Sequence, residues 1–330
     1  MKICVYGAGA VGGHFAAQLA ATGHEVSVVA RGAHLAAMRR GGVTLIKGER
    51  RIVGRVRATD RPAELGPVDA VLVTLKATAL GALAAGVAPL LGPGTAVVFA
   101  QNGIPWWYAQ GLAGGRPAPP DLSPLDPGGA LARAVPAQHV AGGVIYSANE
   151  VVEPGVIRND APQRNMLILG EPDGRASARL QALSAALEAA DIRAPVEPDI
   201  RRSVWAKLLI NLGGASLTLV TGETIRDTFA DPALAAVRKR LSEEGAAIAA
   251  AHGIRLEGAP QPAAHVPGGP AHKASMLQDY ERGRPMELDA ILNAPLWFAR
   301  AAGVATPTLD AVVALAGHQA KKKPAAAGFF

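Results

Sequence analysis

Residues 2–12 read KICVYGAGAVG, a β-branched and apolar run that leads directly into three spaced glycines. The spacing of Gly7, Gly9 and Gly12 is G-x-G-x-x-G, which joins a strand to a helix beside a dinucleotide pyrophosphate. Gly7 would allow the tight turn, Gly9 would let the backbone approach the phosphates, and Gly12 would let the helix pack closely on the strand. A helical run over 11–22 follows, so its first amides could bind phosphate. The stretch therefore predicts a dinucleotide site made by Gly7, Ala8, Gly9, Ala10, Val11 and Gly12.

The same kind of alternation continues to about residue 198. Short β-branched runs between alanine- and leucine-rich stretches predict a mostly parallel sheet wrapped by helices. The strands are expected at 2–6, 25–30, 69–74, 95–100 and 140–146. From about residue 200, amphipathic stretches predict helices at 200–220, 231–252, 271–282, 286–303 and 308–317. The expected fold is α/β: an N-terminal Rossmann-type dinucleotide-binding domain over 1–198 and an all-helical C-terminal domain over 199–330.

Composition narrows the class of protein. The chain has 330 residues, of which 49% are hydrophobic, and one cysteine, Cys4, which excludes an intramolecular disulfide. The start of the sequence has no signal-peptide pattern, and the apolar stretch 79–100 contains prolines and glycines, so we expect a cytoplasmic protein without a membrane span. The net charge of +6 favours anionic partners. The densest basic stretch, 47–57, alternates like a hairpin and has no interleaved aromatic residues, which argues against nucleic-acid binding.

Two basic residues follow predicted strands. Arg31 comes just after the second strand, where NAD-binding sites usually place an acidic residue for the ribose hydroxyls; an arginine there suits the 2′-phosphate of NADP(H). Lys76 follows the strand at 69–74, at the edge of the sheet where open α/β sheets bind ligands. The alternative interpretation is that Arg31 merely begins a solvated loop and that Lys76 is a surface lysine.

Polar side chains also interrupt apolar runs. In VWAKLLINLGGA, residues 204–215, Lys207 and Asn211 are four apart and would share one face of a helix. The strand at 95–100 ends in Gln101, Asn102 and Gly103. Ser275 and Glu287 lie in the stretch 272–289, and Glu287 has Met and Leu neighbours that leave a carboxylate in need of a partner. Each feature also has an ordinary explanation: a lysine that reaches solvent, a strand cap, or an amphipathic helix pair with a capping serine.

Taken together, GAGAVG, VTLKA, QNG, WAKLLIN and SMLQDYERGRPMELD, in this order, resemble the ketopantoate reductase (2-dehydropantoate 2-reductase) family. The resemblance covers nearly the whole chain apart from the Pro/Gly-rich residues 111–136 and the C-terminal tail. It implies NADPH-dependent reduction of a small 2-oxo acid, no metal, and an active site in the cleft between the two domains. A homodimer is left open.

The resemblance also implies roles for single residues. Lys207 matches the catalytic lysine, and Glu287 matches an acid near both the lysine and the cofactor. Asn102 matches an amide that touches cofactor and substrate. The remaining matches are substrate contacts at Asn211 and Ser275, and cofactor contacts at Arg31, Lys76 and the backbone of Ala148.

Two departures from the family pattern bear on the substrate. A second asparagine often follows the first by four residues, but this chain has Ala215, and an Asn-Gly pair is replaced by Leu292-Asn293. Loss of a substrate amide changes hydrogen-bonding selectivity by roughly 1–3 kcal/mol, enough to alter which 2-oxo acid is preferred. The alternatives are therefore a reductase of a different 2-oxo acid, or a non-catalytic protein that senses NADP, although a sensor needs neither Lys207 nor Glu287.

Overall fold

The structure is a computed structural model that describes residues 1–112, 114–260 and 273–323. Its contacts divide the chain into two compact units. Unit 1 contains Met1–Gln101 and Gly128–Ile200, and unit 2 contains Asn102–Pro127 and Arg201–Phe330. The loop segment 102–127 thus groups with the C-terminal helices, which the sequence did not indicate. The predicted domain boundary between residues 198 and 199 stays a prediction.

Unit 1 is built on a seven-stranded sheet in the order β11-β8-β7-β6-β1-β2-β5. Neighbouring strands are parallel except for β11, which pairs antiparallel with β8. The fold class is therefore confirmed: a Rossmann-like, mostly parallel sheet joined to a helical C-terminal part. The sheet's strands are β1 (Lys2–Tyr6), β2 (Glu25–Val29), β5 (Arg57–Thr59), β6 (Val68–Val73), β7 (Leu91–Phe99), β8 (Val140–Tyr146) and β11 (Met166–Gly170).

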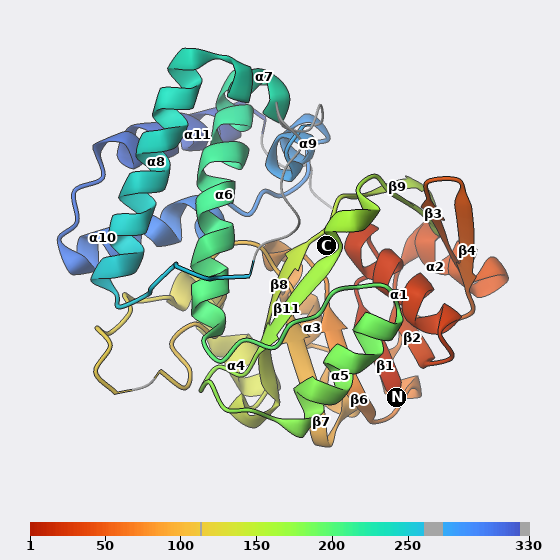
Figure 1. Cartoon of the computed structure of the whole chain (residues 1–330). Coiled ribbons are helices and arrows are strands. Elements are labelled where there is room, and N and C mark those ends of the chain that lie inside the picture. The colour runs from red at the N-terminus through yellow and green to blue at the C-terminus, as the bar shows by residue number, and fades with distance from the viewer. Residues whose placement is uncertain (113, 261–272, 324–330) are drawn as a thin grey trace. The chain divides into compact units, whose positions relative to one another are not determined.

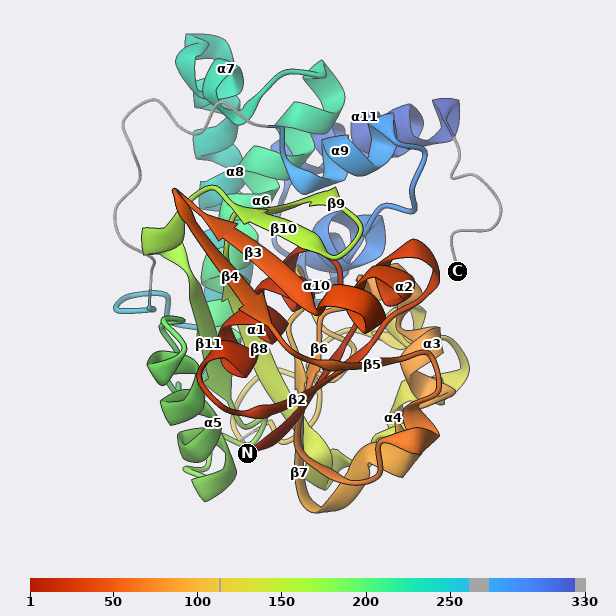
Figure 2. The same ribbon diagram turned by 90° about the vertical axis from the view of Figure 1, so that its right-hand side faces the viewer.

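A second, four-stranded sheet has the order β4-β3-β10-β9 and was not predicted, apart from the hairpin expected at 47–57. Its strands are β3 (Val43–Lys47), β4 (Arg50–Gly54), β9 (Asn149–Glu153) and β10 (Val156–Asn159). Helix α1 (Ala10–Ala21) packs against β1 and β2 on one side and against this smaller sheet on the other (Figure 2). Because α1 is covered on two sides, every residue from Gly12 to Leu19 is buried.

Four further helices complete unit 1: α2 (Gly32–Gly41), α3 (Gly81–Ala84), α4 (Ala130–Ala134) and α5 (Ala178–Ala189). Helix α5 lies beside β11 and β7 (Figure 1). The core between α1, α5 and the main sheet contains Phe15, Leu72 and Leu183, all fully buried. Helix α4 and short 3-10 turns occupy part of the Pro/Gly-rich residues 111–136.

Unit 2 contains helices, turns and loops but no strand among its described residues. Its helices are α6 (Ile200–Thr221), α7 (Ile225–Ala230), α8 (Pro232–Ala251), α9 (Ser275–Glu281), α10 (Ala294–Ala302) and α11 (Pro307–Lys322), with one π-helical turn at Asp289–Asn293 before α10. Glycines allow α6 and α8 to pack closely: a Cβ on Gly245 would lie 2.4 Å from Cδ2 of Leu209. The predicted helices are confirmed with shifted ends, except that residues 271–272 and most of the predicted tail lie outside the described residues.

Among the described helices, only α6 is long and apolar enough to cross a membrane, with a mean hydropathy of 1.3. However, 67% of that window is buried inside the protein. The core helix of a globular protein passes the same test, so the helix is weak evidence for a membrane span.

Candidate functional site

The glycine motif forms a tight turn between β1 and α1 in unit 1. Gly7 has a φ of +104°, which favours glycine, and its N–H donates to the carbonyl of Val29 over 3.1 Å. A Cβ on Gly12 would lie 2.2 Å from the Gly7 carbonyl oxygen, so glycine is required for the close approach of helix and turn. A Cβ on Gly9 would meet no atom within 4 Å, so the space beside Gly9 is open. This arrangement fits the division of roles expected for a pyrophosphate-binding turn.

Thr74 supports the turn, and sequence reasoning missed it. Its Oγ1 donates to the Gly7 carbonyl over 2.6 Å, and its N–H donates to the carbonyl of Tyr6 over 3.0 Å. Thr74 thereby connects the end of β6 to the glycine turn. The signal available in the sequence was a polar residue directly after an apolar strand, two positions before Lys76.

The other predicted cofactor residues of unit 1 follow strands of the same sheet. Arg31 precedes α2 just after β2 and is exposed, while Lys76 is half-buried after β6. Ala148 lies two residues after β8. Because β1, β2, β6 and β8 run parallel, their carboxyl ends meet at one edge of the sheet, where open α/β sheets bind ligands. The structure therefore brings the glycine turn, Arg31, Lys76 and Ala148 to one edge.

Gln101, just after β7, has a structural role at this edge of the sheet. Its Nε2 donates to the carbonyls of Val73 over 2.9 Å and Leu75 over 3.0 Å, which ties the ends of β6 and β7 together. A side chain with two backbone partners of this kind holds the strand ends in register. We therefore assign it a supporting place and leave Asn102 as the candidate contact.

In unit 2, Lys207 and Asn211 lie one turn apart on α6; both are half-buried, and a fully buried leucine follows each of them, at 208 and 212. The Nδ2 atom of Asn211 is buried and has no hydrogen-bond partner among the residues that the structure describes. A buried, unsatisfied donor costs roughly 1–3 kcal/mol, which a ligand acceptor at that position would remove. The pair thus presents an amide in need of an acceptor next to an amine.

Asn102 and Glu287 belong to two segments of unit 2 that are hydrogen-bonded together. The N–H of Ile104 donates to the carbonyl of Ala290 over 2.8 Å. Gly103 has a φ of +83°, and a Cβ there would lie 2.3 Å from the same carbonyl oxygen. Ala290 lies in the π-helical turn, a feature that often occurs at functional sites, and Glu287 is buried just before it. The structure thus holds the backbone beside Asn102 against the segment that carries Glu287.

Ser275 is exposed at the first residue of α9. The residue before the helix is Ala274, which makes no side-chain cap, so the expected alternative of a capping serine is wrong. Ala215 is 6% exposed on α6 and Leu292 is 1% exposed in the π-helical turn. Both departures from the family pattern therefore place apolar groups inside unit 2.

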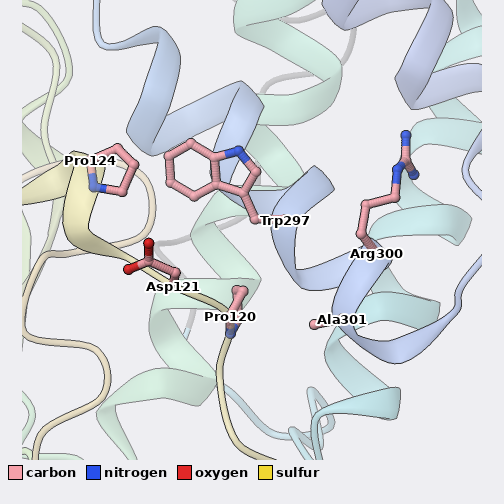
Figure 3. Close-up of a pocket in the computed structure, with 6 residues that line it drawn as sticks. All are labelled: Pro120, Asp121, Pro124, Trp297, Arg300 and Ala301. Carbon is pink, nitrogen blue, oxygen red and sulfur yellow. The ribbon is translucent and has the colours of Figure 1, made fainter.

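The surface pocket of Figure 3 lies elsewhere in unit 2 and holds about 600 Å³. It is lined by residues of the loop and of α10 that include no predicted site residue: Pro120, Asp121, Pro124, Trp297, Arg300 and Ala301. Figure 3 shows the guanidinium of Arg300 directed away from Asp121, and Arg300 pairs with Asp310 instead. No cluster of His, Cys, Asp or Glu in the described part of the chain could hold a metal ion.

Comparisons with known proteins match this organisation. The sequence model described as "Ketopantoate reductase PanE/ApbA" matches residues 3–106, and that for the C-terminal part of the same family matches residues 199–320. A 2-dehydropantoate 2-reductase of Mesorhizobium japonicum is 42% identical over 317 residues, which cover 96% of both chains. A solved structure from Ralstonia solanacearum MolK2, described as a ketopantoate reductase, is 37% identical with a TM-score of 0.84 and covers 97% of this chain and 98% of its own.

A more distant structural neighbour is D-mandelate dehydrogenase in a ternary structure with NADH and anilino(oxo)acetate. Its TM-score is 0.80 at 19% identity, over 98% of this chain and 99% of that one. At this identity the likeness shows the fold alone.

Proposed function

The chain belongs to the ketopantoate reductase family of dinucleotide-binding oxidoreductases, and from that premise we propose that it reduces a 2-oxo acid to the 2-hydroxy acid with NADPH. The nominal substrate is 2-dehydropantoate, and the product is then pantoate, a step of pantothenate biosynthesis. The observation that carries the proposal is the match of 42% identity over 96% of both chains to a curated 2-dehydropantoate 2-reductase. A cytoplasmic location and a homodimer stay part of the proposal.

The glycine turn is the proposed pyrophosphate site. Its support is the open space at Gly9 combined with the crowded surroundings of Gly7 and Gly12, which only glycine tolerates. Helix α1 begins at Ala10, directly after Gly9, so the amides of its first turn could bind the phosphates. Arg31, which is exposed, would bind the 2′-phosphate that distinguishes NADPH from NADH. Lys76 would add a second positive charge.

When bound, the reduced nicotinamide supplies hydride to the oxo carbon. Charge then develops on the substrate oxygen, and Lys207 is the proposed group that stabilises this charge and donates the proton. Asn211, one helical turn further, would hydrogen-bond the substrate through its unpartnered Nδ2 without adding charge. Asn102 and Ser275 complete the proposed substrate contacts, and Glu287 is proposed to orient Lys207 and contact the cofactor.

A reductase of a different 2-oxo acid is the second candidate, and the buried methyl group of Ala215 favours it. Ala215 lies one turn beyond Asn211 and cannot hydrogen-bond a substrate hydroxyl. A site that lacks such a partner discriminates weakly between a hydroxylated substrate and its apolar analogue.

The test is NADPH oxidation with two matched substrates. 2-Dehydropantoate and 3,3-dimethyl-2-oxobutanoate differ only in one hydroxyl, so the ratio of their kcat/KM values reports recognition of that group. A ratio above about 100 supports 2-dehydropantoate as the substrate, whereas a ratio near one favours the second candidate. Lys207→Ala serves as the inactive variant, and Lys239→Ala, an exposed lysine on α8, is the matched control. If no 2-oxo acid supports NADPH oxidation, the remaining hypothesis is a non-catalytic protein that senses NADP.

A further inference from the structure

A buried polar cluster lies beneath the turn between β8 and β9 in unit 1. His14 is fully buried, Asn159 is 2% exposed, and Asn165 is 5% exposed. Ser147 and Asn149 are half-buried and flank Ala148. These five side chains come from α1, the β8–β9 turn, the end of β10 and the start of β11, and we call them the Asn–His cluster.

The cluster fixes the peptide of Ala148. The carbonyl of Ala148 accepts from Nδ2 of Asn159 over 3.2 Å and from the N–H of Asp160 over 2.9 Å. Asn159 Nδ2 also lies 2.6 Å from Oδ1 of Asn149 and 3.0 Å from Oδ1 of Asn165, and Asn165 Nδ2 donates to Asn159 Oδ1 over 3.1 Å. Asn159 Nδ2 has two protons for these three acceptors, so the firm bond to the Ala148 carbonyl is the one from Asp160, and the Asn159 amide lies against the same oxygen. The carbonyl thus faces the protein, and the N–H is the group of Ala148 that we expect to contact a ligand.

His14 connects this turn to the phosphate-binding helix. Asn149 Nδ2 lies 3.2 Å from Nδ1 of His14, and the same amide donates to Ser147 Oγ over 2.7 Å. Ser147 Oγ donates its only proton to Asn165 Oδ1 over 2.7 Å. With the amide placed this way, Nδ1 of His14 is the acceptor, which assigns a neutral ring with its proton on Nε2, a buried atom that has no partner among the described residues. Burial lowers the pKa of His14 to about 3, in agreement with a neutral ring.

The position of His14 connects its hydrogen bond with Asn149 to the cofactor site. His14 lies two residues after Gly12, on the helix that begins directly after Gly9, where a Cβ would meet no atom within 4 Å. We propose that His14 is a positioning residue of the cofactor site: through Asn149 and Ser147 it holds the Ala148 peptide at a fixed place relative to the Gly7–Gly12 turn. Two parts of the cofactor site, on elements more than a hundred residues apart, are thereby joined by side-chain hydrogen bonds. The inference rests on the proposed function, which assigns the turn and Ala148 to the cofactor.

The experiment compares three substitutions on α1. His14→Phe keeps a planar ring but removes the acceptor, and His14→Asn restores an acceptor near the position of Nδ1. Gln18→Met, one turn further along the same buried helix, is the matched control, because Gln18 Nε2 is buried and has no partner among the described residues. Ser147→Ala interrupts the cluster at a half-buried position and gives a second variant in case His14→Phe does not fold.

The measurements are the Kd for NADPH by fluorescence titration, kcat and KM for NADPH, and the melting temperature. We expect His14→Phe and Ser147→Ala to raise Kd and KM for NADPH by about five- to tenfold with less than about a twofold change in kcat at saturation. His14→Asn should recover most of the affinity, and Gln18→Met should match the parent protein. A purely structural role would lower the melting temperature and leave Kd and KM unchanged, and that result would overturn the inference.

The same data separate this inference from the proposed function. If the parent protein binds NADPH but reduces no 2-oxo acid, a weaker Kd in His14→Phe still supports the positioning role while the proposed reaction fails. If the parent reduces a 2-oxo acid and His14→Phe and Ser147→Ala bind NADPH normally, only the positioning role fails. A parent protein that binds no dinucleotide would overturn both.

Discussion

Two alanine substitutions in the glycine turn should have opposite consequences, although they are three residues apart. In Gly12→Ala the new Cβ would lie 2.2 Å from the Gly7 carbonyl oxygen, 2.4 Å from Thr74 Oγ1 and 2.9 Å from Val5 Cγ1. Two of these atoms belong to the hydrogen bond from Thr74 to Gly7, and one is backbone. The helix must therefore move away from the strand. In Gly9→Ala the Cβ meets no protein atom within 4 Å.

The magnitudes follow from these contacts. Overpacking of a tight contact costs typically 1–3 kcal/mol, the lost Thr74–Gly7 hydrogen bond about 1 kcal/mol, and better helix propensity returns about 1 kcal/mol. Gly12→Ala should therefore lower the free energy of unfolding by about 1–3 kcal/mol. At Gly9, which precedes α1 with a φ of −74°, alanine is a poorer cap but reduces the freedom of the unfolded chain. These effects are each roughly 0.5–1 kcal/mol and nearly cancel.

Urea unfolding and an NADPH titration distinguish the two variants. Gly9→Ala should unfold like the parent protein yet bind NADPH at least about tenfold more weakly, because its methyl group takes the space proposed for the pyrophosphate. Gly12→Ala should lose stability whether or not NADPH is present. Parent-like NADPH affinity in a folded Gly9→Ala protein would refute the assignment of the turn. Parent-like stability in Gly12→Ala would refute the packing argument.

Three further predictions concern single charged or titratable groups. Lys207→Ala should lower kcat by at least about a hundredfold and leave the Kd for NADPH within about twofold, as expected for a lost general acid; near-normal turnover in steady-state assays would contradict this. Arg31→Ala should reduce the NADPH-to-NADH ratio of kcat/KM by about 10- to 100-fold, and an unchanged ratio would remove Arg31 from the cofactor site. Burial, and then the positive charge of Lys47, lower the pKa of His14 to about 3, against a smaller opposite effect of Asp191. Between pH 6.5 and 3 the unfolded chain therefore binds a proton that the folded protein does not, so the free energy of unfolding should decrease as the pH decreases over this range, by up to about 5 kcal/mol; urea titrations of His14→Phe should show a smaller decrease.

Much of the fold could be predicted because its signals are local. The β-branched runs at 2–6, 69–74 and 140–146 are strands of the main sheet, and the amphipathic run at 200–220 is α6. The second sheet could not be predicted in the same way. Its central pair joins β3 to β10, between residues 43–47 and 156–159, and no local pattern indicates a pairing across that distance in the chain. The strand β10 also reads VIRN, which is too short and too polar to stand out.

The site residues that the sequence did not reveal, Thr74 and His14, were missed for the same reason as the second sheet. The roles of the three glycines could be predicted because each one meets a requirement of the local backbone. Thr74 and His14 are different, because their partners come from distant segments: Thr74 donates to the Gly7 carbonyl, and His14 accepts from Asn149. In the sequence, His14 is one polar residue in an alanine-rich helix. Its role becomes visible only when β9 and β10 cover α1.

An unpartnered buried atom is not by itself a sign of function in this protein. Trp107 Nε1 and Ser203 Oγ are also buried without a partner among the described residues. Arg201 lies near the ring of Trp107, and its guanidinium donates to the carbonyl of Tyr108 over 2.8 Å. The polar surroundings of Trp107 therefore have a structural role. Asn211 differs because its amide lies one helical turn from Lys207 on α6. The pairing of an unsatisfied donor with a nearby amine, rather than the unsatisfied donor alone, is what favours a substrate oxygen at this place on α6.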